Sequence, residues 1–253
     1  MSAILSKEMQ QHTYEIMNRV EDRHWWFVGR RAILETFLEK IHQTLSAQNS
    51  ELRILDVGCG TGANLEMLAR FGRSEGVDVS DDALAYCRAK GLKVHKGLAE
   101  KLPFEDESFD LVTALDVVEH LDDDVAGLRE MNRVMKNTGR ALIFVPAFMW
   151  LWGVQDDVSN HRIRYTKKQI VERLENAGFE IERATYANWT FFVPILAGRT
   201  LMKLTGIRPE SENNVNISAL NGIFGRIFSA ERYWLKNFDF PFGVSIVITA
   251  RKK

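Results

Sequence analysis

The sequence predicts an α/β protein with a doubly wound, mainly parallel sheet, and two observations support that fold class. Short apolar runs that read as strands alternate with helical segments between residues 52 and 145. The first of these strands also ends directly in a cluster of glycines. Alternating strands and helices form βαβ units, whose strands lie parallel and whose helices cover both faces of one sheet.

Composition fits a globular protein and excludes several classes. The chain has 253 residues, of which 45% are hydrophobic, so it can bury a core and is not intrinsically disordered. A net charge of −1 does not support a nucleic-acid-binding surface. No stretch reaches the roughly 18 apolar residues of a membrane span, and the N-terminus has no apolar core of a signal peptide. Two cysteines cannot form a disulfide framework, so we expect a cytoplasmic protein.

Each element is predicted from its apolar spacing and its end signals. Residues 6–46 carry helical spacing and should form two helices, interrupted by the aromatic residues 24–27. Ser80 and Asp122 stand where helix caps are expected. The core elements then follow as strand 52–57, helix 63–71, strand 75–79, helix 81–90, strand 93–95, strand 109–115, a helix from 122 to about 135, and strand 140–145.

After residue 146 the chain changes character. Thr166 and Gln169 form a capping box for a helix over 167–177, and strands are expected at 179–186 and 244–250. The aromatic segment between those strands is too long for a turn. We therefore divide the chain into an N-terminal helical lid (1–50), a core (51–187), an aromatic insertion over the acceptor site (188–242) and the last core strand (243–253).

The strongest motif is the run Leu-Asp-Val-Gly-Cys-Gly-Thr-Gly at 55–62. A strand that enters glycines and then a helix lets the backbone approach a ligand and aims free N–H groups at it. The spacing of Gly58, Gly60 and Gly62 differs from the dinucleotide fingerprint G-x-G-x-x-G. Asp56, which precedes the glycines, would repel a pyrophosphate but suits a ligand with a cationic amine.

Asp78 ends the second strand of the core. In doubly wound folds an acidic residue at this point hydrogen-bonds the hydroxyls of a ribose. The alternative is that Asp78 only helps to cap the helix after Ser80.

These motifs together resemble the class I S-adenosylmethionine (SAM)-dependent methyltransferases of the type 11 domain group. The resemblance rests on residues 55–62 and 76–80, on Lys-Leu-Pro-Phe at 101–104 and on the run from Phe109 to Leu121. It implies a Rossmann-like seven-stranded sheet with an antiparallel last strand, and SAM as the cofactor. The cofactor-binding residues that it implies are Asp56, Gly58, Gly60, Asp78, Val79, Ala99, Glu100, Leu115 and Asp116.

Asp116, Glu119 and His120 follow the fourth strand and share one face if a helical turn begins there. The pattern resembles the E-x-x-E-H of ubiquinone-pathway and small-RNA methyltransferases, in which these residues bind a divalent metal. The first acid here is Asp, so the pattern leaves a metal bound by carboxylate and imidazole groups open as one alternative, and we assign no metal ligand from the sequence. We predict instead that His120 is a general base. The alternative is that Glu119 and His120 only orient the loop.

A dense set of donors and aromatic rings follows the fifth strand, at the edge of the crevice that should face the acceptor. We predict that His161 is a second catalytic base and that Arg164 holds an anionic group of the acceptor. The alternative is that these residues bond the loop to the sheet and that Tyr165 packs ahead of the next helix. The acceptor-binding residues predicted here are Trp150, Trp152, Arg164 and Tyr165.

Two aromatic segments lie outside the core. Residues 24–27, which precede Arg30 and Arg31, either close over the site as a lid or anchor the N-terminal helices to the sheet. Residues 189–204 form an amphipathic helix with basic flanks that would touch a membrane interface or a lipid-like acceptor. The alternative for that helix is a buried cover or a dimer contact, and the sequence predicts no oligomeric state.

The sequence therefore predicts a SAM-dependent methyltransferase that acts on a small-molecule or lipid-like acceptor, at an oxygen atom, without a nucleic-acid partner. Two other classes stay open. An NAD-dependent dehydrogenase shares the fold and the ribose-binding acid but not the glycine spacing. A catalytically inactive SAM-binding module would keep the cofactor residues without methyl transfer.

Overall fold

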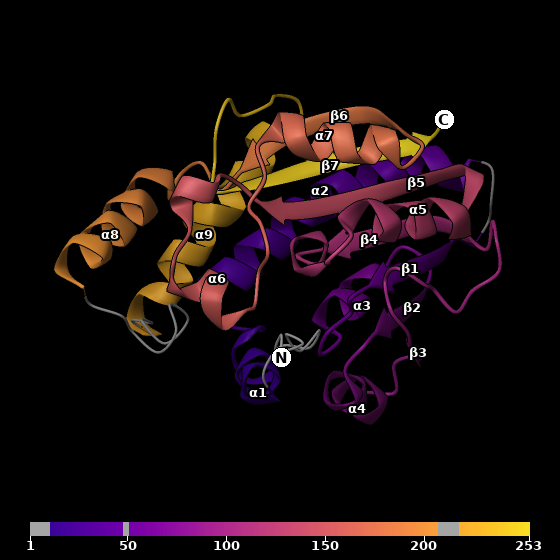
Figure 1. Cartoon of the computed structure of the whole chain (residues 1–253), viewed down its shortest axis with the longest axis horizontal. Helices are drawn as coiled ribbons and strands as arrows, with labels where there is room; N and C mark the ends of the chain where they lie inside the picture. Colours follow the sequence, from indigo (N-terminus) through magenta and orange to yellow (C-terminus); the bar gives the residue numbers. More distant parts are fainter. Residues whose placement is uncertain (1–10, 48–50, 207–217) are drawn as a thin grey trace, which may run out of the picture.

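The computed structural model describes residues 11–47, 51–206 and 218–253, and a seven-stranded sheet forms its centre (Figure 1). The strand order is β3-β2-β1-β4-β5-β7-β6, and it reverses between β1 and β4. The strands are β1 (Arg53–Val57), β2 (Arg73–Asp78), β3 (Val94–Lys96), β4 (Phe109–Leu115), β5 (Met135–Pro146), β6 (Phe179–Ala187) and β7 (Ser245–Lys252).

Strand direction confirms the predicted fold class. The pairs from β3 to β5 are parallel, whereas β7 runs antiparallel to both β5 and β6. β4 is buried along its whole length, as expected for a central parallel strand covered on both faces. The carboxyl ends of β1 and β4 lie side by side where the order reverses, and that crevice is where doubly wound folds bind ligands.

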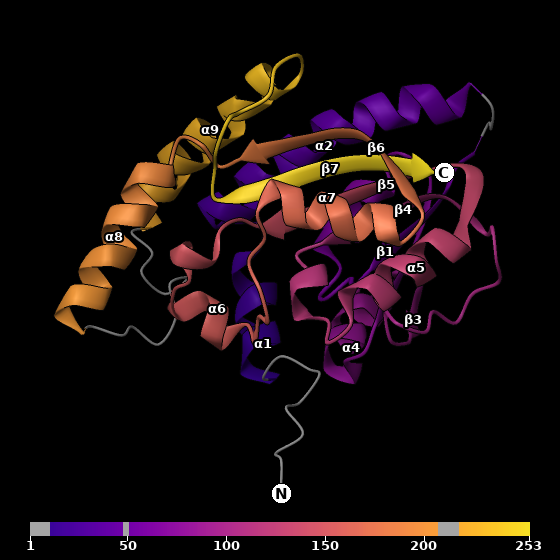
Figure 2. The same ribbon diagram turned by 45° about the horizontal axis from the view of Figure 1, so that its top comes forward.

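Helices cover both faces of the sheet. Figures 1 and 2 show α5 (Asp124–Val134) and α7 (Lys167–Asn176) on one face, and α2 (Trp25–Ser46) and α9 (Ser218–Leu235) on the other. The remaining helices are α1 (Gln11–Val20), α3 (Ala63–Leu68), α4 (Asp81–Ala89), α6 (Val154–Val158) and α8 (Phe192–Thr205), with short 3-10 turns η1 (Val118–His120) and η2 (Met149–Leu151).

Most of the predicted helix ends are confirmed. Ser80 caps α4, and Thr166 and Gln169 form the capping box of α7. The predicted cap at Asp122 is wrong, because the neighbouring Asp123 accepts the N–H of Ala126 at the start of α5. Two N-terminal helices form as predicted, but the break between them lies at residues 21–24 and not at 24–27. His24 caps α2, so the aromatic residues are its first turn and not an interruption.

The N-terminal helices and the insertion pack against each other. α2 and α9 approach so closely that a Cβ on Gly29 would lie 2.2 Å from Phe228, a fully buried residue of α9. Trp25 adds ring contacts to Phe191 and Phe224. Part of the insertion, residues 207–217, lies outside the described residues. Within the described part of the chain, every helix is too short or too polar to cross a membrane.

Candidate active site

One cavity of about 1050 Å³ lies at the carboxyl ends of β1, β2 and β4. Its walls come from the glycine loop after β1, the loops after β4 and β5, and the helices α1, α2, α6 and α8. Protein ligand pockets range over about 300–1,000 Å³, so this cavity has room for more than one small ligand.

The glycine loop forms the floor of one half of the cavity. The N–H groups of Gly58 and Cys59 donate to the carbonyl of Val77 at 2.8 and 3.1 Å, which ties the loop to β2. Gly58 has a φ of +68°, and a Cβ there would lie 2.4 Å from Val117. Only glycine fits this position, because it tolerates both the left-handed backbone and the close neighbour.

Asp78 lies at the end of β2, as the strand pattern predicts, and lines the cavity. One carboxylate oxygen accepts the N–H of Gly60 and the other accepts the N–H of Ser80, both at 2.9 Å. Asp78 therefore fixes the glycine loop and the start of α4. The capping alternative is therefore confirmed as a shared role, since Ser80 caps α4 and Asp78 holds Ser80, while the ribose contact of Asp78 stays a prediction.

Asp56 lies behind the glycine loop and does not line the cavity. It is 1% exposed and accepts a hydrogen bond from the hydroxyl of Thr113 at 2.6 Å. Burial raises the pKa of Asp56 to about 7, against the opposing effects of Thr113 and the charge of Arg30. Asp56 can thus act on a bound ligand through its charge and through the position of the loop.

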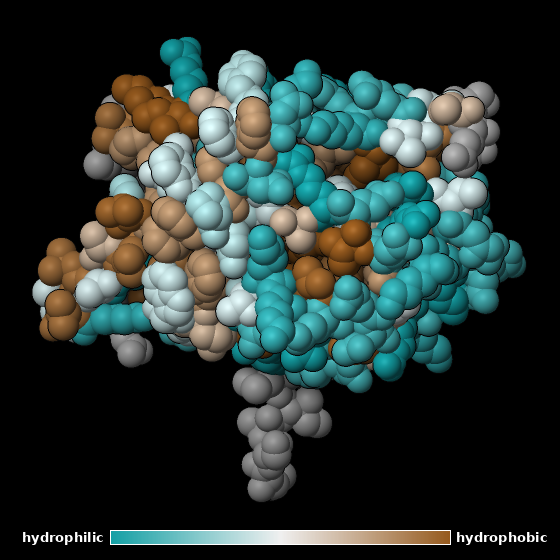
Figure 3. Space-filling view, turned by 90° about the horizontal axis from the view of Figure 1, so that it is seen from above, coloured by the Kyte–Doolittle hydropathy of each residue, from teal (hydrophilic) through white to brown (hydrophobic). Residues whose placement is uncertain are grey.

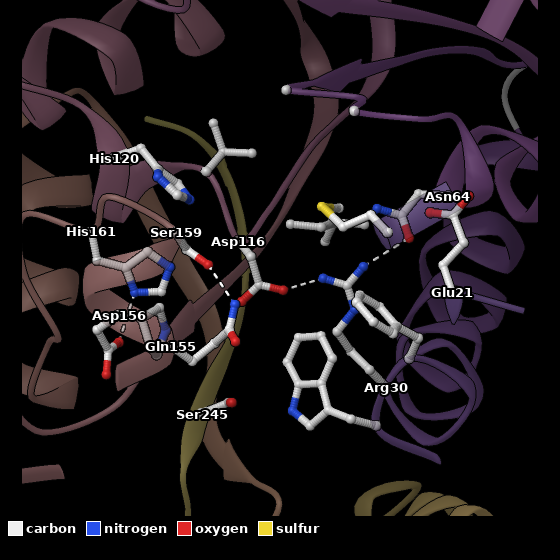
Figure 4. Close-up of a pocket in the computed structure, with 18 of the residues that line it drawn as sticks. Glu21, Arg30, Asn64, Asp116, His120, Gln155, Asp156, Ser159, His161 and Ser245 are labelled. Atoms are coloured by element: carbon white, nitrogen blue, oxygen red, sulfur yellow. Dashed lines mark hydrogen bonds and ion pairs between the residues drawn. The ribbon is translucent and has the colours of Figure 1, made fainter. Parts of the chain in front are cut away.

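Arg30 connects α2 to both halves of the cavity, and no local pattern distinguishes it from Arg31. It lies on α2, 5% exposed, and forms an ion pair with Asp116. Its other terminal nitrogen donates to the side-chain oxygen of Asn64 at 3.0 Å (Figure 4). The guanidinium also lies over the ring of Trp26, at 5.1 Å from its centroid. The distance between residues 30 and 116 in the sequence explains why this pair was missed.

The α1–α2 turn is fastened to the glycine loop. The hydroxyl of Thr61 donates to the carboxylate of Glu21 at 2.6 Å, and Lys90 of the α4 end lies 3.4 Å from the same carboxylate. Burial raises the pKa of Glu21, although Thr61 and Lys90 oppose that shift. These contacts hold the α1–α2 turn against the glycine loop.

Three side chains gather in the other half of the cavity: Glu119 and His120 on η1, and His161 after α6. The rings of His120 and His161 meet edge to face with centroids 4.7 Å apart, and Nε2 of His161 lies 3.9 Å from Glu119. Both histidines line the cavity, whereas Glu119 is 0% exposed behind them. Burial, together with the charges of His161 and Arg162, lowers the pKa of His120 to about 3, so its ring is neutral at pH 7.

Asp156, which the sequence did not indicate, organises this half. It is 1% exposed, and its carboxylate accepts from Nδ1 of His161 at 2.7 Å and from Nε of Arg164 at 2.8 Å. Arg199 of α8 lies 3.5 Å from its second oxygen. Burial alone would raise the pKa of Asp156, but His161, Arg164 and Arg199 lower it overall. Arg164 is thus paired with Asp156 and also lines the cavity, and its predicted contact with an acceptor stays a prediction.

The predicted site residues fall into two groups. Tyr165, Trp150 and Trp152 do not line the cavity. Tyr165 is fully buried and donates to Asp124 at 2.8 Å, which is the packing role left open as its alternative. Trp150 stacks on Phe148 at the surface, and Trp152 donates to Asp157. The predicted residues that line the cavity are Gly58, Gly60, Asp78, Val79, Ala99, Glu100, Leu115, Asp116, His120, His161 and Arg164.

Comparison of the sequence with known proteins agrees with this geometry. A family model described as a methyltransferase domain matches residues 55–143. A demethylmenaquinone methyltransferase of Chlorobaculum parvum is 32% identical over 142 residues, 53% of this chain and 55% of that protein. A protein of Mycolicibacterium smegmatis named probable S-adenosylmethionine-dependent methyltransferase is 32% identical over 150 residues, 57% of this chain and 58% of that protein. The chain thus spans little more than half the length of these curated relatives.

Solved structures show the same fold along nearly the whole chain. A SAM-dependent methyltransferase of Thermotoga maritima superposes with a TM-score of 0.58 at 20% identity, covering 96% of this chain and 100% of that one. A Haloferax volcanii methyltransferase, solved in complex with the Trm112 methyltransferase activator, gives a TM-score of 0.61 at 18% identity, covering 97% and 98%.

Proposed function

Since the chain carries a class I SAM-dependent methyltransferase domain with SAM as its cofactor, we propose that the protein transfers the methyl group of SAM to an oxygen atom of an apolar, lipid-like small molecule. One observation carries this proposal. A single cavity joins the glycine loop and Asp78 to the cluster around His120 and His161, beneath the apolar helix α8.

The cofactor half supplies a partner for each part of SAM. The carboxylate of Asp78 faces a cavity that suits the two ribose hydroxyls, and Val79, Ala99 and Glu100 flank the place for adenine. The methionine end would lie over Gly58 and Gly60, near Arg30. A guanidinium binds a carboxylate with two parallel hydrogen bonds, so Arg30 is the group we assign to the methionine carboxylate.

The acceptor half supplies the groups that an O–H acceptor needs. Its oxygen attacks the sulfonium methyl in line, so most of the rate enhancement must come from holding the two reactants in the correct geometry. The hydroxyl proton must leave as the C–O bond forms. We assign that proton to Asp116 or His161, which both line the cavity, and Figure 4 shows Asp116 between the Arg30 side and the His161 side.

An apolar acceptor is supported by the wall that α8 contributes. Ile195, Leu201 and Met202 line the cavity, while Leu204, one turn further along, is 81% exposed. The relative named demethylmenaquinone methyltransferase supports a small-molecule acceptor in the same way. An amphiphile with its reactive hydroxyl near His161 would lay its apolar part along α8.

We extend this proposal to peripheral contact with a membrane through residues 189–204. Figure 3 shows apolar side chains gathered at the end of the molecule where α8 and α9 lie. Val193 and Leu201 are 66% and 60% exposed on α8, and Ile223 is 53% exposed on α9. An exposed apolar helix face beside basic side chains such as Lys203 is typical of interfacial binding. The cytoplasmic location expected from the sequence remains a prediction, and it is compatible with a peripheral contact of this kind.

A methyl-transfer assay tests the reaction. The purified chain is incubated with SAM labelled in its methyl group and with a lipid extract, then with purified amphiphilic phenols, alcohols and amines. We expect label in an ether that survives alkaline hydrolysis, and at least a roughly 100-fold slower transfer by His161→Ala. Label in an amine would contradict oxygen as the acceptor atom. If the chain binds SAM but transfers no methyl group to any of these compounds, the proposed reaction is contradicted and the alternative of an inactive SAM-binding module is supported.

A vesicle assay tests the membrane contact. Leu204→Glu should lower co-sedimentation with vesicles that contain anionic phospholipid, because it places a charge on the apolar face of α8. Asn176→Glu, which adds the same charge at an exposed position of α7, is the matched control and should bind as wild type does. Equal binding by all three proteins, or none by wild type, would contradict the contact.

A further inference from the structure

The carboxylate of Glu119 is buried among described neighbours that do not compensate its charge. It is 0% exposed, and both of its oxygens lack a hydrogen-bond partner among the residues that the structure describes. Burying a carboxylate without a partner is costly, and such groups in proteins are almost always paired, hydrogen-bonded or bound to a metal.

The nearest donor atoms to Glu119 are imidazole nitrogens. One atom each of Glu119, His120 and His161 lies within 4.8 Å of the other two, as the ligands of one ion would. The residues come from two different loops, after β4 and after α6. The N–H of Arg162 donates to the main-chain carbonyl of Glu119 at 2.7 Å, so the two loops are fastened together beside the cluster.

Each histidine is also held in orientation from behind. Nδ1 of His161 is bonded to Asp156 at 2.7 Å (Figure 4). Its Nε2 lies 3.9 Å from a carboxylate oxygen of Glu119. His120 hydrogen-bonds the main chain at Asn160 and Ser159. Metal-binding histidines use their second ring nitrogen in this way, toward a carboxylate or a main-chain carbonyl, and this fixes the ring and raises its basicity as a ligand.

We propose that Glu119, His120 and His161 bind a divalent transition-metal ion between the two loops, with its remaining positions open to the cavity that the two histidines line. Two imidazoles and one carboxylate favour Mn²⁺, Fe²⁺, Co²⁺ or Zn²⁺ over Mg²⁺ or Ca²⁺, which prefer oxygen ligands throughout. The third donor, His161, lies 41 positions beyond His120, and that separation is why the pattern at 116–120 did not predict a site.

The consequence for catalysis rests on the proposed function. A bound ion would orient an acceptor hydroxyl and lower its pKa. His120 and His161 would then be ligands and not bases, and Asp116 would remain to take the proton. Metal binding is a property of the protein alone, so it can be measured whether or not any methyl transfer is detected.

Metal titration tests this site. The tag-free chain is stripped with a chelator and titrated with Co²⁺, whose visible absorption reports its coordination, and with Mn²⁺ and Zn²⁺ by calorimetry. We expect one ion per chain, loss of binding in Glu119→Gln and in His161→Ala, and a roughly 10–100-fold loss of affinity in Asp156→Asn, which removes a positioning contact. His95→Ala removes a histidine that is also paired with a buried carboxylate, that of Glu75, and should bind as wild type does.

Titration of the same variants with S-adenosylhomocysteine (SAH) separates a lost site from a lost fold. Glu119→Gln and His161→Ala should still bind SAH, because neither residue is assigned to the cofactor. If His161→Ala does not fold, His161→Gln is tested in its place. The proposal is overturned if the stripped wild-type chain binds none of the three ions at one per chain. It is also overturned if Glu119→Gln binds them as wild type does.

Discussion

The two halves of the cavity are built in different ways. The floor of the cofactor half comes from short segments at strand ends that the parallel register brings together, as Gly60 contacts Asp78. The acceptor half is assembled from residues far apart in the sequence, as His161 meets Glu119 and Arg199 meets Asp156. Local assembly makes the cofactor half predictable from motifs, whereas the contacts between distant residues in the other half leave no motif in the sequence.

The largest expected effect comes from the residue that joins the halves. Arg30→Met should lower the free energy of unfolding by about 4 kcal/mol, because it leaves Asp116 without the cation that pairs with it. It should also weaken SAM binding, since we assign the methionine carboxylate to this side chain. Urea denaturation and SAM calorimetry measure the two effects. A variant as stable as wild type would show that the ion pair does not couple the halves.

Asp56→Asn should separate stability from cofactor binding within the cofactor half. Because burial raises the folded-state pKa of Asp56 to about 7, the folded chain keeps a proton that the unfolded chain loses, and wild-type stability falls as the pH rises from about 4 to 7. Asn cannot ionise and still accepts from Thr113. We expect no gain below pH 4 and a gain on the order of 4 kcal/mol at pH 8.

Urea denaturation of both proteins at pH 4, 6 and 8 checks this prediction. SAM affinity at pH 8 should fall in Asp56→Asn, because the negative charge behind the glycine loop is removed. A stability gain that is the same at every pH would show that ionisation of Asp56 is not its cause.

Gly58 and Gly60 form a matched pair in the same loop. Both have positive φ, but a Cβ on Gly58 would meet Val117 at 2.4 Å, whereas the nearest atom to a Cβ on Gly60 is 3.9 Å away. Gly58→Ala should therefore cost about 2 kcal/mol more than Gly60→Ala, which bears only the backbone strain. Thermal denaturation of the two variants gives the difference, and equal losses would contradict the close approach.

Tyr165→Phe should have the smallest effect and tests the acceptor half. The hydroxyl donates to Asp124 inside the core, so its removal should cost about 1 kcal/mol of stability. Because Tyr165 does not line the cavity, the KM for the acceptor should not change. A raised KM with unchanged stability would return Tyr165 to the acceptor-binding role predicted from the sequence.

These comparisons explain what the sequence could predict. The positions of Gly58 and Asp78 in the cavity could be predicted because strand ends and backbone conformation are local properties that depend on adjacent residues. Arg30 and Asp156 were missed because their importance arises only where α2 and α6 meet the loop after β4. Trp150 was assigned to the acceptor from its residue type, but the direction of its ring depends on packing against Phe148 that no local pattern specifies.

Calorimetric titration with SAH tests most directly that this cavity is a SAM site. We expect one SAH per wild-type chain, no binding of NAD⁺, and an affinity at least roughly 100-fold lower in Asp78→Ala, which loses charge-assisted hydrogen bonds to the ribose. If the wild-type chain does not bind SAH, or binds NAD⁺ in its place, the cavity is not a SAM site.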